Sequence, residues 1–273
     1  MALDQKLVEQ KANDIRVNSL KMIHAANSGH PGGSLSIADI LSVLYFGGQL
    51  KYDPKNPELK DRDILVVSKG HSSPAVYSAL GLAGFYPIED TMSFRQLGSQ
   101  FQGHIDRMRV PGVEMSTGSL GHGLSNSLGI ALAAKLDNNS KTIFTILSDG
   151  ELQEGSNWEA IMAAAHFKMN NLIAILDRNR IQLDGWTETT MGLDPIREKL
   201  EAFNWDVQEI NGHDVNAIND AINKAKSSSS GKPQFIIAAT VKGKGVSFME
   251  DQVAWHGVAP SAEDLEKALK ELN

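Results

Sequence analysis

The sequence predicts an α/β fold in which helices cover both faces of a parallel sheet. Short apolar runs alternate along the chain with longer segments whose apolar residues recur at helical spacing. The central run, residues 141–147, is mainly apolar or β-branched, as expected of a strand buried on both faces. Strands that alternate with helices in this way form parallel sheets covered by their own connections. We expect one domain that spans residues 1–273.

The composition is that of a globular protein and argues against several classes of partner. The chain has 273 residues, of which 41% are hydrophobic, enough to fill a sizeable core. A net charge of −7 argues against binding to nucleic acid or to an anionic membrane surface. No apolar run is long enough to span a bilayer, and the first residues lack the apolar segment of a signal peptide. The absence of cysteine excludes disulfides and thiolate catalysis and fits a cytoplasmic protein.

The part of the chain before the central strand predicts four helices and one strand. The apolar spacing predicts a helix over residues 3–27, and Ser34 or Ser36 is expected to cap a second helix that ends at Phe46. A strand over residues 64–67 is followed by a turn that holds His71, and a helix begins near Ser73. A long loop that holds His104 then leads into a helix with a glycine-rich start, before the central strand.

The remainder of the chain continues the alternation of strand and helix. The predicted elements are a helix over 154–167, strands over 172–176 and 205–210, a helix over 215–226, a strand over 233–241 and a charged helix from 261. The run of serines at 227–230 is read as a short connector within the domain.

Two oxygen-bearing side chains follow neighbouring central strands. Asp149 comes directly after one strand, and Asn179 follows the next. Ligands bind beyond the carboxyl ends of the strands in open parallel sheets, so both side chains are expected at one edge. Their oxygens suit Mg²⁺, while Gly150 and the helix that starts near Glu154 would accommodate an anionic diphosphate. An ordinary strand–helix turn with polar residues is the alternative interpretation of this pattern.

The histidines are concentrated at turns and loops. Six of the eight lie beside glycine, where an imidazole could approach a phosphate or a hydroxyl group. Exposed polar turn residues are the alternative for any one of them taken alone. His24 and His166 lie within predicted helices and are expected to serve packing or the surface.

The central motif resembles that of thiamine diphosphate enzymes. Those enzymes carry Gly-Asp-Gly and, nearly thirty residues later, Asn or Asn-Asn. Here Ser148 and Arg178 replace one residue of each element, but Asp149 and Asn179 are present. The resemblance implies a thiamine-diphosphate-binding fold, with Asp149, Asn179 and the main-chain carbonyl of Ile181 as ligands to Mg²⁺.

Five further strings, in order, resemble the amino-terminal half of transketolases over nearly the whole chain. They are SGHPGG at 28–33, SKGH at 68–71, GHIDR at 103–107, TGSLGHG at 117–123, and KGKG with WHG at 242–257. The family implies a transferase of two-carbon ketol units between sugar phosphates. The cofactor supplies the carbon nucleophile, while the protein binds it and moves protons.

The resemblance also assigns a role to each matching residue. The cofactor-binding set comprises His71, Gly118, Leu120, Asp149, Gly150, Glu154, Asn179, Leu183 and His256. The catalytic set comprises His30, His104 and His256, which would line the sugar channel, and His30 with His256 would serve the C3 hydroxyl. Glu154 matches a glutamate that links the two cofactor sites of the family's dimer. Ile105 replaces a common proline and His122 a common glutamine, which leaves the setting of the channel open.

The resemblance implies that a second chain completes the enzyme. In transketolases, the glutamate that protonates the aminopyrimidine belongs to a later domain, and no segment up to Asn273 matches it. We therefore expect a separate carboxyl-terminal subunit, which would form a heterotetramer with two copies of each chain. Two alternatives stay open. One is another thiamine diphosphate enzyme, resembling deoxyxylulose-phosphate synthase or the alpha subunit of a 2-oxo acid dehydrogenase. The other is a regulatory or scaffold domain without catalysis.

Overall fold

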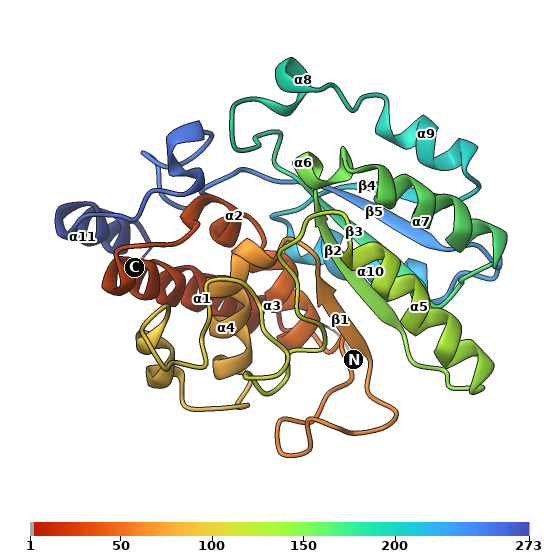
Figure 1. The fold of residues 1–273 in the computed structure, drawn as a ribbon, viewed down its shortest axis with the longest axis horizontal. Helices are drawn as coiled ribbons and strands as arrows, with labels where there is room; N and C mark the ends of the chain where they lie inside the picture. The colour runs from red at the N-terminus through yellow and green to blue at the C-terminus, as the bar shows by residue number, and fades with distance from the viewer. Residues whose placement is uncertain (1–2, 273) are drawn as a thin grey trace.

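The core of the molecule is a parallel sheet of five strands in the order β1-β2-β3-β5-β4 (Figure 1). The computed structural model describes residues 3–272. The strands are β1 (Ile64–Val67), β2 (Ile143–Ser148), β3 (Leu172–Arg178), β4 (Asp206–Asn211) and β5 (Gln234–Ala239). Each predicted strand is present, and every pairing between neighbours is parallel.

Helices cover both faces of the sheet, as predicted, and two apolar clusters hold them there. On one face Leu65, Phe144 and Ile236 contribute to a cluster with α1 (Gln5–Ala26), α3 (Ala38–Phe46), α4 (Ser73–Leu82) and α10 (Val215–Lys226). On the other, Val66 and Leu147 share a cluster with α5 (Gly123–Leu136), α7 (Gly155–His166) and α9 (Ile196–Ala202). Neighbouring strand residues alternate between the clusters because successive side chains point to opposite faces.

Short elements and a terminal helix complete the chain. They are α2 (Pro31–Ser36), α6 (Asp149–Leu152), α8 (Thr187–Thr190), α11 (Ala262–Leu272) and the 3₁₀ helices η1 (Gly70–Ser72), η2 (Ile88–Ser93) and η3 (Val253–His256). A third apolar cluster, which includes Leu20, Met249 and Ala268, packs α11 against α1 (Figure 1). This packing anchors the carboxyl-terminal segment beside the first helix.

One predicted helix start was wrong, and one short helix was not predicted. Helix formation after the first glycine-rich turn begins at Pro31, with His30 at the N-cap, so neither Ser34 nor Ser36 caps it. Proline suits the first helical turn because the amide hydrogen it lacks would have no partner there. The connection after β2 also turns helical earlier than expected. Asp149 is the first residue of α6, and Glu154 is the N-cap of the next helix, α7.

Candidate functional site

A cavity of about 330 Å³ lies at the carboxyl ends of β1, β2, β3 and β5. Eleven of the twelve residues in the predicted site line it. These are His30, His71, His104, Gly118, Leu120, Gly150, Glu154, Asn179, Ile181, Leu183 and His256. The twelfth, Asp149, is fully buried directly beside its Gly150 wall. The fold therefore brings together residues that are up to 226 positions apart, from 30 to 256.

Four imidazoles form one wall of the cavity. The ring centroid of His30 lies 5.2 Å from that of His71, 5.5 Å from that of His256 and 6.2 Å from that of His104. The rings come from separate places in the chain, namely the N-cap of α2, η1, the loop before α5, and the end of η3. Their convergence was not predictable from spacing, although each flanking glycine was visible in the sequence.

Burial keeps these imidazoles neutral. It lowers the pKa of His30 to about 4, with help from the positive charge of Arg95, and that of His256 to about 3, with help from Lys242. The pKa of His71 also falls well below its ordinary value, chiefly through burial and then through Lys69. Neutral rings at neutral pH can accept protons or hydrogen bonds, as general bases must.

The three expected metal ligands meet at the ends of β2 and β3. Burial, followed by the charge of Asp177, raises the pKa of the Asp149 carboxyl although Arg178 lies 3.2 Å away, so a further cation would stabilise its charged form. The side-chain amide of Asn179 donates to Asp177 over 2.9 Å. Its oxygen accepts the main-chain amide of Ile181 over 3.1 Å and keeps a second lone pair that a metal ion could use. The carbonyl of Ile181 accepts an ammonium hydrogen bond of 2.8 Å from Lys242 and therefore already accommodates a cation.

These ligands fit Mg²⁺ only as part of a shared coordination shell. Among residues 3–272, no three His, Cys, Asp or Glu side chains gather in a way that would hold a metal ion. One carboxylate, one amide and one carbonyl leave the remaining octahedral positions to phosphate oxygens and water, which is the usual arrangement for this ion. The site therefore suits a metal that arrives with a diphosphate.

Two buried lysines were missed by the sequence reasoning. Lys242 bridges the Ile181 carbonyl and Nδ1 of His256, and burial, followed by the charge of Lys69, lowers its pKa to about 8. Lys69 is 1% exposed and pairs with the fully buried Asp177. Both lie within strings that were singled out for their histidines and glycines, SKGH and KGKG, so the signal was present.

Asp177 ties the elements of the site together. Its carboxylate accepts hydrogen bonds from Lys69 after β1, Ser36 of α2, Asn179 after β3 and Thr240 after β5. Burial works to raise the pKa of Asp177, but the charge of Lys69 and these donors lower it. An ionised carboxylate therefore cross-links four segments under the floor of the cavity.

Glu151 cross-links the segments that form the wall around Gly118 and Leu120. Its buried carboxylate accepts from the Ser68 hydroxyl and from the main-chain amides of Gly121 (3.0 Å) and Ser148 (3.3 Å). These bonds position the segment that carries Gly118 and Leu120. Gly118 has φ +148°, and a β-carbon there would lie 2.9 Å from the His104 ring, so glycine is required.

The remaining histidines lie outside the cavity. His213 accepts the Val241 amide at Nε2 and donates through Nδ1 to Asp39, which fixes its neutral tautomer. His122 is the N-cap residue of α5, and its side chain makes no capping hydrogen bond. His24 and His166 lie in helices α1 and α7, as predicted.

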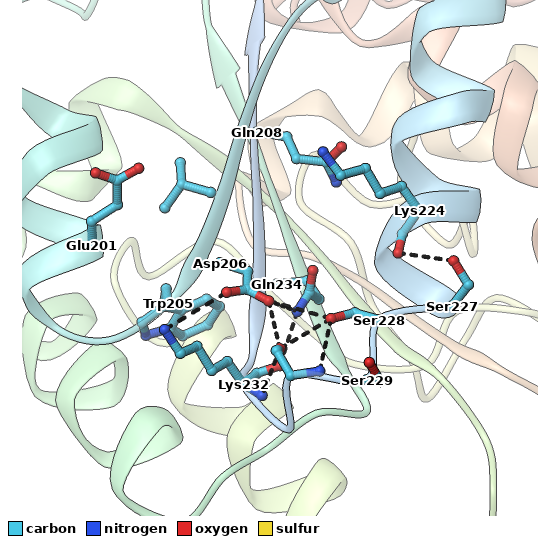
Figure 2. A pocket seen from close by; sticks show the side chains of 12 residues that line it. Glu201, Trp205, Asp206, Gln208, Lys224, Ser227, Ser228, Ser229, Lys232 and Gln234 are labelled. Carbon is cyan, nitrogen blue, oxygen red and sulfur yellow. Dashed lines mark hydrogen bonds and ion pairs between the residues drawn. The ribbon is translucent and has the colours of Figure 1, made fainter.

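A larger pocket, of about 790 Å³, lies at the opposite edge of the sheet (Figure 2). It is bordered by the amino ends of β4 and β5 and by the serines that follow α10. There Asp206 accepts hydrogen bonds from Ser228, Ser230 and Gln234 and forms an ion pair with Lys232. These polar groups bond to one another, whereas the smaller cavity holds the predicted site residues. We therefore take the smaller cavity as the functional site.

Known proteins match this chain throughout. The family model for the transketolase thiamine diphosphate binding domain matches residues 7–273. A 6-deoxy-6-sulfo-D-fructose transketolase subunit of Clostridium sp. is 43% identical and is matched over 100% of this chain and 98% of its own length. A subunit of the apulose-4-phosphate transketolase of Actinobacillus succinogenes is 40% identical, over 97% of this chain and 95% of its own.

Solved structures confirm the cofactor-binding fold. Transketolase from Campylobacter jejuni superposes with a TM-score of 0.92 at 40% identity, over 100% of this chain but 43% of its own. The chain thus spans almost all of the separate subunits but less than half of a full-length enzyme. No helix among the described residues is long and apolar enough to cross a membrane.

Proposed function

The chain belongs to the transketolase family as an amino-terminal subunit, and we propose that it transfers a two-carbon ketol unit from a ketose phosphate to an aldose phosphate with thiamine diphosphate and Mg²⁺. The observation that carries the proposal is the convergence of His30, His104 and His256 on the cavity that also holds the metal-ligand edge. Proton-transfer groups and an anion-binding edge within one cavity are what this reaction requires of the protein.

The cofactor would lie across the carboxyl ends of the strands. Its diphosphate would contact His71, Gly150 and His256, with Mg²⁺ held by Asp149, Asn179 and the Ile181 carbonyl. The rings would lie against Gly118, Leu120 and Leu183, and Leu183 is 66% exposed, as a residue that awaits a ligand would be. When bound, thiamine diphosphate supplies a carbon nucleophile that cleaves the ketose next to its carbonyl.

The chain's own histidines would handle protons and hydroxyl groups. Neutral His30 would accept the proton of the donor's C3 hydroxyl and return it to the acceptor aldehyde. His104 would bind the donor's terminal hydroxyl. Lys242 donates to Nδ1 of His256 over 2.8 Å, so the neutral ring of His256 carries its hydrogen on Nε2 and would assist the same step by donating a hydrogen bond to the C3 oxygen.

A two-carbon transfer is favoured over the other thiamine diphosphate chemistries. The substrates of a 2-oxo acid dehydrogenase have no C3 hydroxyl to deprotonate, so such an enzyme would not need three imidazoles in its substrate channel. A scaffold protein would gain nothing from buried, cross-linked charges around an anion edge, because such charges are costly to bury. Deoxyxylulose-phosphate synthesis stays the closer alternative, and product analysis distinguishes it.

The identity of the sugars is a further part of the proposal. The two relatives are named for a sulfonated fructose and for apulose 4-phosphate, and one solved transketolase was complexed with fructose 6-phosphate. We infer that the donor is a ketose with a terminal anionic group and that the enzyme works in the cytoplasm, within the pentose phosphate pathway or a related sugar pathway.

The central experiment tests whether activity requires a second subunit. We expect a carboxyl-terminal subunit to cover the cofactor and a heterotetramer with two copies of each chain to form. The purified chain should show no ketol transfer from fructose 6-phosphate to an aldose phosphate when Mg²⁺ and thiamine diphosphate are supplied. Addition of the partner should restore transfer, with a sedimentation mass near that of two copies of both chains. Robust turnover by the isolated chain would refute the two-chain assignment.

A further inference from the structure

Arg95 lies in the loop between η2 and α5 and is not among the residues that line the cavity. Its guanidinium donates to the hydroxyl of Ser28 over 2.5 Å and to the carbonyl of Gly103 over 3.4 Å. Ser28 stands two residues before His30, and Gly103 stands directly before His104. One side chain therefore links the two turns that carry two of the four imidazoles.

The backbone is arranged to place this side chain. Arg95 has φ +59°, a left-handed conformation that is strained for a residue with a β-carbon. A main-chain bond of 2.9 Å from Arg95 to Phe101 and the full burial of neighbouring Phe94 hold it there. A β-carbon at residue 103 would lie 2.6 Å from Nε of Arg95, so Gly103 is needed for the guanidinium to fit.

The charge of Arg95 is not neutralised within this part of the chain. Among residues 3–272 no carboxylate forms an ion pair with it, and its buried Nε has no hydrogen-bond partner. A cation that is partly withdrawn from water without a counter-charge is costly, so a stabilising salt bridge does not explain it. The hydrogen bonds of Arg95 instead connect the turns that carry His30 and His104.

We propose that Arg95 is a positioning residue for ketol transfer, which fixes the spacing of the His30 and His104 imidazoles by cross-linking the turns that hold them. This inference rests on the proposed function. The ring centroids of the pair lie 6.2 Å apart. A displacement of about 1 Å in a reacting group can cost roughly 10²-fold in rate, so a fixed spacing matters.

The same guanidinium favours the neutral form of both rings. Burial comes first among the influences that lower the pKa of His30 and of His104, and the charge of Arg95 comes next for each. The other groups that face His30 are Lys69, Lys242, His71 and His256, none of which is anionic. Removal of the Arg95 charge should therefore raise both pKa values.

Three substitutions separate the cross-link from the charge. Arg95→Met removes both, Arg95→Lys keeps the charge without the planar fork, and Ser28→Ala removes one bond without changing charge. Arg109→Met is the matched control, since Arg109 is an exposed residue paired with Asp106. In the assembled enzyme with fructose 6-phosphate as donor, we expect Arg95→Met to lower kcat by about 10²-fold without a change in cofactor affinity. The control Arg109→Met should change neither quantity.

Magnetic resonance on the full chain gives a readout that does not need catalysis. The ring signals of His30 and His104, assigned with His30→Gln and His104→Gln, should show a ring-to-ring nuclear Overhauser effect. We expect that effect to weaken in all three Arg95 and Ser28 variants. The titrations of both rings should move to higher pH in Arg95→Met but not in Arg95→Lys or Ser28→Ala, and the acid limb of kcat/KM should follow the same pattern.

The positioning role and the proposed function fail in different ways. Full turnover in Arg95→Lys, or an undiminished Overhauser effect in Arg95→Met, would overturn the positioning role even in an active transketolase. If Arg95→Met fails to fold, Ser28→Ala decides, and unchanged turnover and Overhauser effect in that variant would overturn the role. If the wild-type assembly transfers no ketol unit while the Overhauser effect still disappears on substitution, the proposed function is refuted and the positioning of the rings stands.

Discussion

The two edges of the sheet differ in what their polar groups lack. At the amino edge, which borders the larger pocket, Asp206 accepts hydrogen bonds from Ser228, Ser230 and Gln234 and pairs with Lys232 (Figure 2). At the carboxyl edge, the pKa of the buried Asp149 carboxyl is raised even though Arg178 lies 3.2 Å away and the amides of Gly150 and Arg180 donate to it, and Nδ1 of His30 is buried without a partner. Incomplete compensation, rather than volume, distinguishes a binding site from a surface hollow.

The contrast between the edges should be greatest at the metal ligands. Asp149→Ala removes the only expected carboxylate ligand, so Mg²⁺-dependent binding of thiamine diphosphate to the assembled enzyme should be lost. Asn179→Ala should weaken it by about 10- to 100-fold, because Mg²⁺ depends on near-complete octahedral coordination. Isothermal titration calorimetry with and without Mg²⁺ measures both, and unchanged affinity in the Asp149 variant would end the metal assignment.

A substitution in the imidazole wall tests catalysis apart from binding. His30→Gln should lower kcat with a ketose phosphate donor by about 10²- to 10⁴-fold, the usual range for loss of a general base. Cofactor affinity should change far less, since His30 is not assigned to the diphosphate. Steady-state rates and calorimetry on the same preparation separate the two. Equal losses in both quantities would contradict the proton-transfer role.

The floor of the cavity should be as important for stability as for function. Lys69→Met leaves Asp177 buried without its cation, and such a change destabilises a protein by about 3–5 kcal/mol. Urea unfolding of the isolated chain measures the loss. The double substitution Lys69→Met with Asp177→Asn should recover part of it, because no unpaired charge remains. A single variant as stable as the wild type would show that the pair contributes nothing.

Acid should weaken the carboxyl edge selectively. The folded pKa values of His30 and His256, about 4 and about 3, lie below the ordinary value of 6.5. As the pH falls below 6.5, the unfolded chain takes up protons that the folded chain does not. The free energy of unfolding should therefore decrease from about pH 6.5 down to the folded pKa values. A His30→Gln, His256→Gln variant should show a shallower decrease by denaturant titration, and an identical profile would argue against buried neutral rings.

The smallest effect on activity is expected at the amino edge. Asp206→Asn weakens the acceptor of several hydrogen bonds and should cost about 1 kcal/mol of stability, within the usual range for such bonds. Ketol transfer and cofactor affinity should be unchanged because this edge faces away from the cavity. A marked loss of activity without loss of stability would show that the larger pocket participates in function.

Much of the fold could be predicted because strand and helix periods are local. The strand predicted over 141–147 corresponds to β2, and the helix predicted over 154–167 corresponds to α7. The elements that were missed are short. Helix α6 has four residues and α2 has six, which is too short for a helical repeat of apolar residues to be visible in the sequence. The glycines of α2 also favoured a turn.

The site was predictable only where a motif carried it. His30, His71, Gly118 and Asn179 stand in recognisable strings, and all of them line the cavity. The cross-linking carboxylates Asp177 and Glu151, by contrast, stand in no special pattern. Their role depends on burial beside donors from distant segments, which sequence spacing does not encode.

The strand order has a kinetic consequence. Strand β5 lies between β3 and β4, so β4 has no neighbour in the sheet until the later strand inserts. Lys242 and His256 follow β5, so a chain still emerging from the ribosome cannot assemble the cavity until residue 256 has been synthesised. Parallel sheets built from such distant pairings form slowly. Thiamine diphosphate, together with the proposed Mg²⁺, would bind only the finished edge and would therefore shift the folding equilibrium toward the complete molecule.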